Sequence, residues 1–268
     1  MIDIKNKVFV FTGVTGTLGS VQAEGLAKAG AKLALLGRNQ NLLSEQVDTL
    51  RQYHTDVEAY QVDVLNKAEL EATASKIVAR FGTIDALINA VGGNLQGATI
   101  PDDKTIFDLS ENDFDTVLNL NLKGTILPSI VFGKVMSQNG KGAIVNYSSM
   151  AVDRAITRVV GYSAAKAAME NFTRWMAVEM ALKFGDGLRV NAIAPGFFIA
   201  KQNQRLLTNE DGSLTERGQK IINNTPMRRF GKPEELNGAI QFLCSESASF
   251  ITGAVLPIDG GFNAFSGV

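Results

Sequence analysis

A tyrosine and a lysine four positions apart, Tyr162 and Lys166, are the residues of this sequence best suited to proton transfer. The surrounding run, residues 162–180, is rich in helix formers, so the spacing predicts two side chains on one helix face, one turn apart. A free tyrosine has a pKa near 10, and work near neutral pH needs a shift of roughly 3 units, or about 4 kcal/mol. An ammonium group about 4 Å away supplies roughly that much at an effective dielectric constant near 20. The pair is therefore predicted to move a proton to or from a hydroxyl or carbonyl oxygen.

A Tyr/Lys pair at helical spacing often arises by chance, so the pair alone does not establish a catalytic role. Two further polar residues support this interpretation. Residues 142–149 read as a short buried strand whose end presents Ser149, thirteen residues before the tyrosine. Asn121 lies in a helix-like run that follows a serine cap at Ser110. The candidate catalytic group is thus drawn from several elements.

The elements that must position these residues alternate between strand-length apolar runs and helix-length amphipathic segments. Continuous β-rich runs between helices predict a parallel sheet with helices on both faces, which is the α/β, doubly wound, Rossmann-type arrangement. The sequence contains neither a linker nor a repeat, so we expect one domain over residues 1–268. The seven predicted strands are 8–11, 32–36, 57–62, 84–89, 143–146, 188–192 and 255–258.

Two connections are longer than the sheet requires, and both follow the carboxyl ends of predicted strands, where open α/β sheets bind ligands. They span residues 92–110 and 196–232. Long loops in compact domains are usually functional lids or disordered. We expect residues 197–232, with two short helix-like pieces, to form an insertion that covers the substrate.

A glycine-rich turn, Thr12–Gly19, follows the first predicted strand and opens the first helix. Glycines permit a tight turn there and let backbone N–H groups approach a pyrophosphate at the helix N-terminus. The residues predicted to hold a dinucleotide at this turn are Gly13, Thr15, Gly16, Thr17, Leu18 and Gly19.

Taken together, these motifs resemble the short-chain dehydrogenase/reductase family along essentially the whole chain. The resemblance implies hydride transfer with a nicotinamide cofactor and an active tetrad. In that tetrad Tyr162 would be the acid/base, and Ser149 would bind the reacting oxygen. Lys166 would lower the pKa of the phenol and bind the ribose, and Asn121 would hold a relay water.

The resemblance also implies cofactor contacts, with three departures from the family pattern. Thr17 stands where the family's glycine turn has its middle glycine, Ala90 replaces an asparagine, and Phe197-Phe198-Ile199 replaces a segment that often holds a threonine near the carboxamide. Asp63 and Val64 would contact the adenine, and Pro195 and Gly196 would lie beside the nicotinamide. The remaining contacts implied are Asn89, Ala90, Gly92, Tyr162 and Lys166.

The choice of cofactor depends on the end of the second predicted strand, Gly37-Arg38-Asn39. An acidic residue there would hold the ribose 2′-hydroxyl of NAD, whereas an arginine can accept the 2′-phosphate of NADP. Arg38 offers a planar fork of donors, with Asn39 beside it. The sequence favours NADP(H), with NAD(H) as the alternative.

The substrate prediction rests on segments that resemble the D-mannonate oxidoreductase (fructuronate reductase) branch of the family. These are residues 89–94, 158–162, 195–198 and 259–268, together with Gln202-Asn203. A sugar acid carries one carboxylate and several hydroxyls. Arg158 could pair with the carboxylate, and Asn94, Gln202 and Asn203 could bind hydroxyls, with Ser149 on the reacting oxygen.

Two other functions stay open. A reductase for gluconate-type sugars, or for 3-oxoacyl groups on a carrier protein, would keep the tetrad and change only the lids. A carrier protein would require a basic surface at the mouth, for which the sequence offers Arg154, Arg158, Lys201 and Arg205. A non-catalytic nucleotide-binding protein is disfavoured, because it would not need a tyrosine beside a lysine.

Composition excludes several classes. The net charge is −1 without a long charged block, which disfavours a nucleic-acid binder, and no apolar run reaches membrane-spanning length. The start of the chain has no signal core, and the single cysteine, Cys244, excludes an intrachain disulfide, so we expect a cytoplasmic protein. His54 is the only histidine, which argues against a metal centre. The family resemblance suggests a homotetramer.

Overall fold

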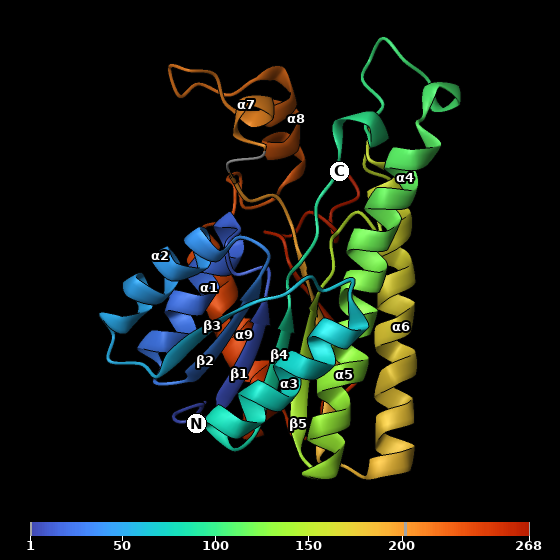
Figure 1. The fold of residues 1–268 in the computed structure, drawn as a ribbon. Helices are drawn as coiled ribbons and strands as arrows, with labels where there is room; N and C mark the ends of the chain where they lie inside the picture. Colours follow the sequence, from blue (N-terminus) through green and yellow to red (C-terminus); the bar gives the residue numbers. More distant parts are fainter. Residues whose placement is uncertain (1, 201–202, 268) are drawn as a thin grey trace.

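The computed structural model describes residues 2–200 and 203–267. Its centre is a seven-stranded parallel sheet with the order β3-β2-β1-β4-β5-β6-β7, which confirms the predicted fold class (Figure 1). The strands are β1 Val8–Thr12, β2 Lys32–Gly37, β3 Val57–Gln61, β4 Ala86–Asn89, β5 Gly142–Tyr147, β6 Leu188–Pro195 and β7 Val255–Ile258. Half of these strand boundaries coincide with the predicted ones, and the others differ by one to three residues.

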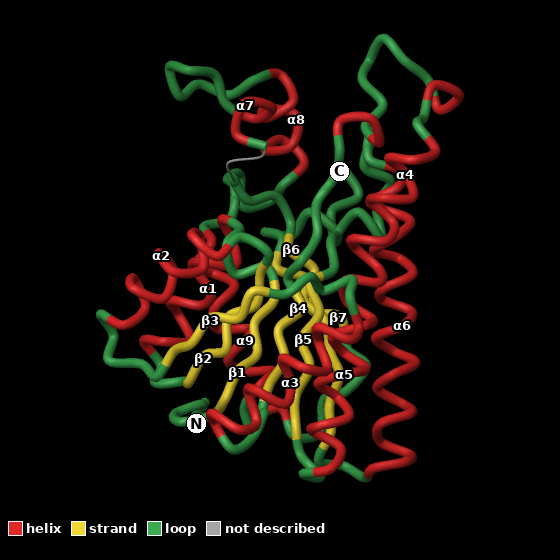
Figure 2. The backbone as a smooth tube through the Cα atoms, viewed as in Figure 1, coloured by secondary structure: helices red, strands yellow, loops and turns green. Residues whose placement is uncertain are grey.

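Helices cover both faces of the sheet, as Figure 2 shows. The strands are apolar on both sides for this reason: in β1, Phe9 and Phe11 pack into one core cluster with α1, α2 and α9, while Val8 and Val10 pack into the other with α3, α5 and α6. The helices are α1 Thr17–Lys28, α2 Gln40–Arg51, α3 Lys67–Phe81, α4 Glu111–Leu118, α5 Gly124–Gln138, α6 Val160–Phe184, α7 Gln204–Leu207, α8 Glu216–Asn224 and α9 Asn237–Cys244.

Short irregular helices connect these elements. A π-helical turn, Asn119–Lys123, joins α4 to α5. Four 3-10 turns lie elsewhere, at Gln96–Ala98, Ile106–Asp108, Pro233–Leu236 and Glu246–Ala248.

The parallel registers gather the predicted site residues at one edge of the sheet. Thr12 at the end of β1 pairs with Asn89 of β4, and Asn89 pairs with Asn146 of β5. The segments that leave these three strands, with Gly13, Gly92 and Ser149, therefore start side by side. This is the carboxyl edge, and it includes the switch point between β1 and β4.

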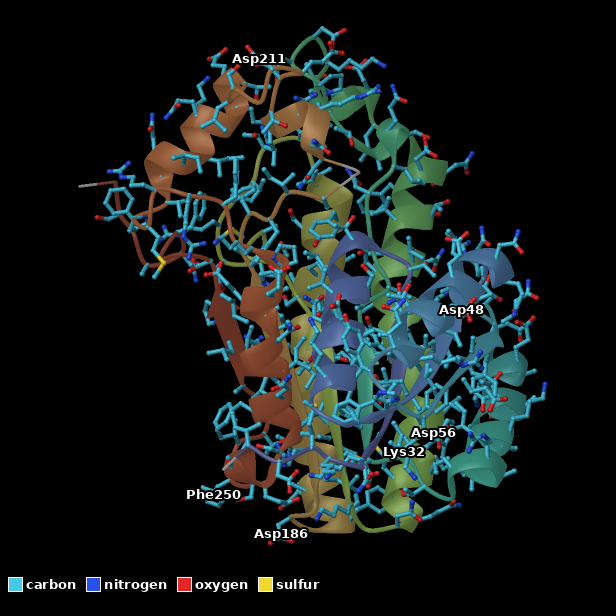
Figure 3. The ribbon with its side chains drawn as sticks, turned by 90° about the vertical axis from the view of Figure 1, so that its left-hand side faces the viewer. Lys32, Asp48, Asp56, Asp186, Asp211 and Phe250 are labelled. Atoms are coloured by element: carbon cyan, nitrogen blue, oxygen red, sulfur yellow. The ribbon has the colours of Figure 1, made fainter. Side chains whose placement is uncertain are left out.

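Both long connections stand beyond this carboxyl edge (Figure 1). The segment 197–232 contains α7 and α8, and its tip is marked by Asp211 in Figure 3, at the end of the molecule opposite Asp186 and Phe250. The role of the segment 197–232 as a substrate lid stays a prediction. The assignment of residues 1–268 to one domain also stays a prediction. None of the helices described is long and apolar enough to cross a membrane.

Candidate active site

Lys166 is the buried cation of the site. It lies on α6 with 3% of its surface exposed, and its Nζ donates a hydrogen bond of 2.6 Å to the carbonyl oxygen of Tyr147, at the end of β5. The same nitrogen is 5.6 Å from the centroid of the Tyr162 ring, one turn earlier on the helix. Burial lowers the pKa of Lys166 to about 8, because removal from water disfavours the charged form.

The pKa of Tyr162 corrects the electrostatic expectation from the sequence. Burial raises the pKa of the phenol, and a hydrogen bond with Ser149 opposes that rise. Proximity of the ammonium group does not place the phenol near neutrality, because the two groups lose solvation together and Lys166 directs its charge at the Tyr147 carbonyl. The phenol of this site is therefore protonated at neutral pH.

Asn121 is fully buried in the π-helical turn and acts as a clamp on the segment after β4. Its Nδ2 donates to the carbonyl oxygens of Gly93 (2.7 Å) and Val117 (2.8 Å), and its Oδ1 accepts from the N–H of Gly93 at 3.1 Å. Both amide protons are thus used, and one lone pair of Oδ1 is left. The implied task of holding a water stays a prediction.

Gly92 brings these residues together. A Cβ atom there would lie 2.6 Å from Asn121 Oδ1 and 3.2 Å from Lys166 Nζ, so only a glycine lets this backbone pack against both. The loop after β4, the π-helical turn and α6 therefore meet at one point beside Tyr162.

The glycine turn has the geometry of a dinucleotide cradle. Gly13 has a φ of 76°, and a Cβ there would lie 2.6 Å from the backbone of Ala90; a Cβ on Gly19 would lie 2.3 Å from Gly13 O. Gly16 is extended (φ −80°, ψ 160°) and caps α1, and Thr17 is the first helical residue. The departure from the family pattern at Thr17 is accommodated, since that position needs no glycine conformation.

The N-terminus of α1 suits an anion. No described side chain caps it, whereas Asn39 and Asn66 cap α2 and α3. Uncapped N–H groups and the helix dipole attract phosphate, and the adjacent Thr15 and Gly16 are exposed. Leu18 packs against the core beneath. The residues present fit a pyrophosphate.

Two residues predicted to contact the cofactor also have structural roles. Asn89 is buried, and its Nδ2 donates to Ser129 Oγ and Asn146 Oδ1, both at 2.9 Å. The Oδ1 of Asn39 accepts from the first N–H groups of α2. These side chains secure the sheet and the helix next to the cradle, and their contact with a cofactor stays a prediction.

The other predicted cofactor residues lie at the same edge. Arg38 is exposed at the end of β2, with its carbonyl oxygen bound by Gln61 Nε2 at 3.0 Å. Asp63 accepts the N–H of Leu65 at 2.9 Å, and Val64 is buried next to it.

Pro195 and Gly196 form a turn that is tied to the serine loop and to the C-terminal segment. The N–H of Met150 donates to Pro195 O at 3.4 Å, and a Cβ on Gly196 would lie 2.6 Å from Asp259 Cα. Beyond it, Phe197 packs edge-on against Phe262 with ring centroids 5.3 Å apart. A cavity of about 330 Å³ opens beside this turn; its lining includes Phe197, Phe198, Thr225, Met227 and Asp259 but no member of the tetrad.

The predicted substrate residues separate into two groups. Asn94 and Arg158 each bury an unpartnered atom, Oδ1 and Nε respectively, among the described residues. Asn203 is a correction, because its amide accepts from Ala200 N (2.7 Å) and donates to Phe198 O (2.9 Å), which closes its own loop rather than facing a ligand. Gln202 lies outside the described residues.

The sequence prediction missed two groups. Glu170, 1% exposed, accepts a 2.5 Å hydrogen bond from Ser148 and pairs with Arg174 at 2.9 Å; its position one turn after Lys166 could have revealed it. Arg217 on α8 donates to Thr157 Oγ1 at 3.3 Å, a contact across 60 positions that no local pattern signals.

The only cysteine and the only histidine of the sequence are not among the site residues. Cys244 is buried, which raises its pKa to about 12, and His54 is exposed. Across the described ranges, no cluster of three or more metal-ligating side chains occurs.

Comparisons with known proteins agree with this geometry. The family model described as enoyl-(acyl carrier protein) reductase matches residues 13–263. The Bacillus subtilis oxidoreductase UxuB, itself uncharacterised, is 44% identical over 275 residues, which covers 99% of this chain and 98% of the relative. The chain is an oxidoreductase and belongs to the short-chain dehydrogenase/reductase family.

Two solved structures are similar over nearly the full length. A proposed D-mannonate oxidoreductase from Haemophilus influenzae, with bound NAD, has a TM-score of 0.92 at 41% identity, and the match covers 99% of this chain and 98% of that one. A proposed gluconate dehydrogenase from Agrobacterium tumefaciens has a TM-score of 0.88 at 29% identity, with 98% of each chain covered.

Proposed function

We propose that this oxidoreductase interconverts a hydroxyl and a carbonyl group of a sugar acid, D-mannonate and D-fructuronate. The observation that carries the proposal is Arg158, in the loop that leads into α6 and four residues before Tyr162, whose Nε is buried without a partner among the described residues. A buried unpaired guanidinium donor at the entrance to the helix of Tyr162 supports an anionic substrate. The similarity to the Haemophilus protein supports the same substrate.

The chain's own residues perform the proton transfer. In the reductive direction the protonated phenol of Tyr162 donates its proton to the carbonyl oxygen, and Ser149 donates a hydrogen bond to that oxygen. Oxidation reverses this, with Tyr162 accepting the proton. A raised phenol pKa favours the donor form at neutral pH, so oxidation should require a more alkaline medium than reduction.

A nicotinamide cofactor would lie across the carboxyl edge, with its pyrophosphate on the Gly13–Gly19 turn, its ribose near Lys166 and its nicotinamide beside Pro195-Gly196. When bound, it supplies the hydride for reduction or accepts it on oxidation. The fit rests on the N-terminus of α1, which no described side chain caps, and on the close packing at Gly13 and Gly92.

NADP(H) is the cofactor that we propose on the basis of Arg38, and NAD(H) is the alternative that the bound NAD of the Haemophilus structure supports. If Arg38 binds the 2′-phosphate, Arg38→Ala should weaken NADPH binding by about 1.5–3 kcal/mol, the loss of a charged hydrogen bond. NADH binding should barely change. Titration of both cofactors checks this; equal losses, or a wild-type preference for NADH, would show that Arg38 is only a surface residue.

The substrate proposal is tested by a panel of hexuronic and aldonic acids, assayed through nicotinamide absorbance in both directions. We expect the highest kcat/KM for fructuronate and mannonate. A gluconate-type acid is the second candidate, because of the similarity to the Agrobacterium protein, and preference for it would replace our first choice. Turnover of 3-oxoacyl carrier-protein substrates alone would refute both.

The carrier-protein alternative finds less support at the mouth of the site. Arg154, one of the cations it would use, donates hydrogen bonds to Asn263 in the C-terminal segment. Lys201 lies outside the described residues.

We also propose that the enzyme is cytoplasmic. The sequence has only one cysteine, which is buried and cannot form an intrachain disulfide, and this agrees with a reducing compartment.

A further inference from the structure

The lid segment brings a second guanidinium group to Arg158. Arg217 lies in the first turn of α8, and its Nη1 donates a 3.3 Å hydrogen bond to Thr157, the residue before Arg158. Arg217 is half-buried. Helix α8 of the segment 197–232 therefore contacts the loop that leads into α6, the helix that carries Tyr162 and Lys166.

These two cations are close without a matching anion. Burial, followed by the charge of Arg158, lowers the pKa of Arg217, so the charged form of Arg217 is disfavoured at this position. Asp102 opposes this electrostatically, but no carboxylate of the described residues forms an ion pair with either arginine. The first turn of a helix is also the wrong end for a cation. By contrast, Arg80 and Arg229 each contact a carboxylate.

The backbone at Arg158 is held in a costly conformation. Its φ of 79° lies in the left-handed region, which is strained for a non-glycine residue. The carbonyl oxygen of Arg158 accepts the N–H of Ile100 at 2.9 Å, which joins this loop to the segment after β4. Residues in such conformations persist at ligand sites when their surroundings hold them.

Two unsatisfied atoms on these joined segments have complementary needs. Arg158 Nε is a buried donor without an acceptor, and Asn94 Oδ1 is a buried acceptor without a donor. Asn94 directly follows Gly93, whose backbone is hydrogen-bonded to Asn121. A ligand carboxylate would satisfy Arg158 Nε, and a ligand hydroxyl would satisfy Asn94 Oδ1.

We propose that Arg158 and Arg217 together bind the carboxylate of the substrate, and that the lid helix α8 contributes to acid specificity through Arg217. This inference rests on the proposed function and adds a residue from the lid to it. An anion between the guanidinium groups removes their mutual repulsion, so an acid holds α8 against the Arg158 loop. A neutral sugar lacks this effect.

The test compares Arg217→Met with Lys220→Met, a change of similar size on an exposed lysine one turn further along α8. Binding of D-mannonate is measured by calorimetry in the presence of reduced cofactor, with which the alcohol cannot react, and D-mannitol serves as the neutral probe. We expect Arg217→Met to weaken mannonate binding about 10- to 100-fold, the range of a lost charged hydrogen bond, without changing mannitol binding. Lys220→Met should bind both as the wild type does, and Arg217→Lys should lie between.

Turnover measurements separate the two proposals. If the wild type turns over sugar acids and Arg217→Met leaves their KM and mannonate affinity unchanged, the arginine pair is refuted while the function stands. If no sugar acid is turned over but mannonate binding depends on Arg217, the pair stands and the function fails. Equal losses for mannonate and mannitol would give Arg217 a merely structural role, and a wild type that binds no hexonate refutes both. Circular dichroism of each variant excludes misfolding.

Discussion

At the scale of single residues, burial acts on the two central groups in opposite directions. It raises the pKa of Tyr162 and lowers that of Lys166, so both changes favour the uncharged forms. The carbonyl of Tyr147 and the hydroxyl of Ser149 provide the polar partners that make this burial tolerable. The site therefore begins in a state suited to donating a proton.

The first prediction concerns this proton donor. Tyr162→Phe removes one hydroxyl and little volume, so turnover should fall at least about a hundredfold while cofactor binding survives. Tyr60→Phe is the matched control, because the hydroxyl of Tyr60 is buried and has no partner among the described residues. Its removal should leave activity and stability unchanged or slightly better. Steady-state kinetics and cofactor titration measure both; wild-type turnover in Tyr162→Phe would remove the phenol from the mechanism.

The second prediction is a pH dependence of stability at Lys166, whose pKa falls from 10.5 to about 8 on folding. Between these values the unfolded chain binds more protons than the folded one, so stability rises with pH in this window. Below this pH window the buried charge of Lys166 lowers the free energy of unfolding by about 3 kcal/mol, because each unit of pKa shift corresponds to about 1.4 kcal/mol. The wild type should therefore gain up to that amount relative to Lys166→Met between pH 8 and 10.5.

Chemical denaturation of both proteins across the window measures this gain. Lys134→Met, on an exposed position of α5, should show no comparable pH-dependent difference from the wild type. A difference between wild type and Lys166→Met that stays constant from pH 8 to 10.5 would contradict the depressed pKa.

At the scale of elements, the irregular turn between α4 and α5 does what a regular helix could not. The π-helical turn orients the side chain of Asn121 toward Gly93, while the backbone of Asn121 stays within the helical run. Such turns often lie at functional sites. The loop after β4, held by this side chain, then approaches Lys166 through Gly92.

Gly92→Ala tests this contact between elements. The new Cβ would lie 2.6 Å from Asn121 Oδ1 and 3.2 Å from Lys166 Nζ, so one or both catalytic groups must move. We expect a loss of turnover of at least about tenfold, since displacement of about 1 Å can cost a hundredfold. Gly238→Ala in α9 is the control, because a Cβ there meets nothing within 4 Å and alanine favours helix by about 1 kcal/mol. Equal activities of the two variants would show that the loop adapts freely.

At the scale of the whole molecule, one helix carries an unusual amount of exposed apolar surface. Trp175, Val178 and Leu182 of α6 are 62%, 59% and 77% exposed, and their spacing places them in one stripe along this helix. Figure 1 shows α6 at the edge of the molecule. A symmetric pairing of two copies would bury the same stripe on both. We therefore propose that α6 is a contact between subunits of a homotetramer.

The prediction is that Trp175→Glu combined with Leu182→Glu reduces the oligomer, measured by sedimentation velocity, without loss of helix content. Leu42→Glu on α2, at 43% exposure, is the control and should sediment as the wild type does. A wild type that sediments as a 28.7 kDa monomer would refute the assembly.

The sequence by itself determined the features that depend on local spacing. Strand-length apolar runs between helices specified the parallel sheet, because both faces must be covered, and the i, i+4 spacing placed Tyr162 and Lys166 on one face of α6. The strand before Ser149 and the glycines at 13 and 19 were readable for the same reason.

Only the tertiary structure decided what depends on packing between distant segments. The sign of the Tyr162 pKa shift follows from burial, which spacing does not reveal. Asn203 looked available to a sugar until the fold showed its amide bound within its own loop. Arg217 joins Thr157 and the Arg158 loop across 60 positions of chain, and such a contact depends on where α8 packs, because hydrogen bonds between remote segments leave no local period in the sequence.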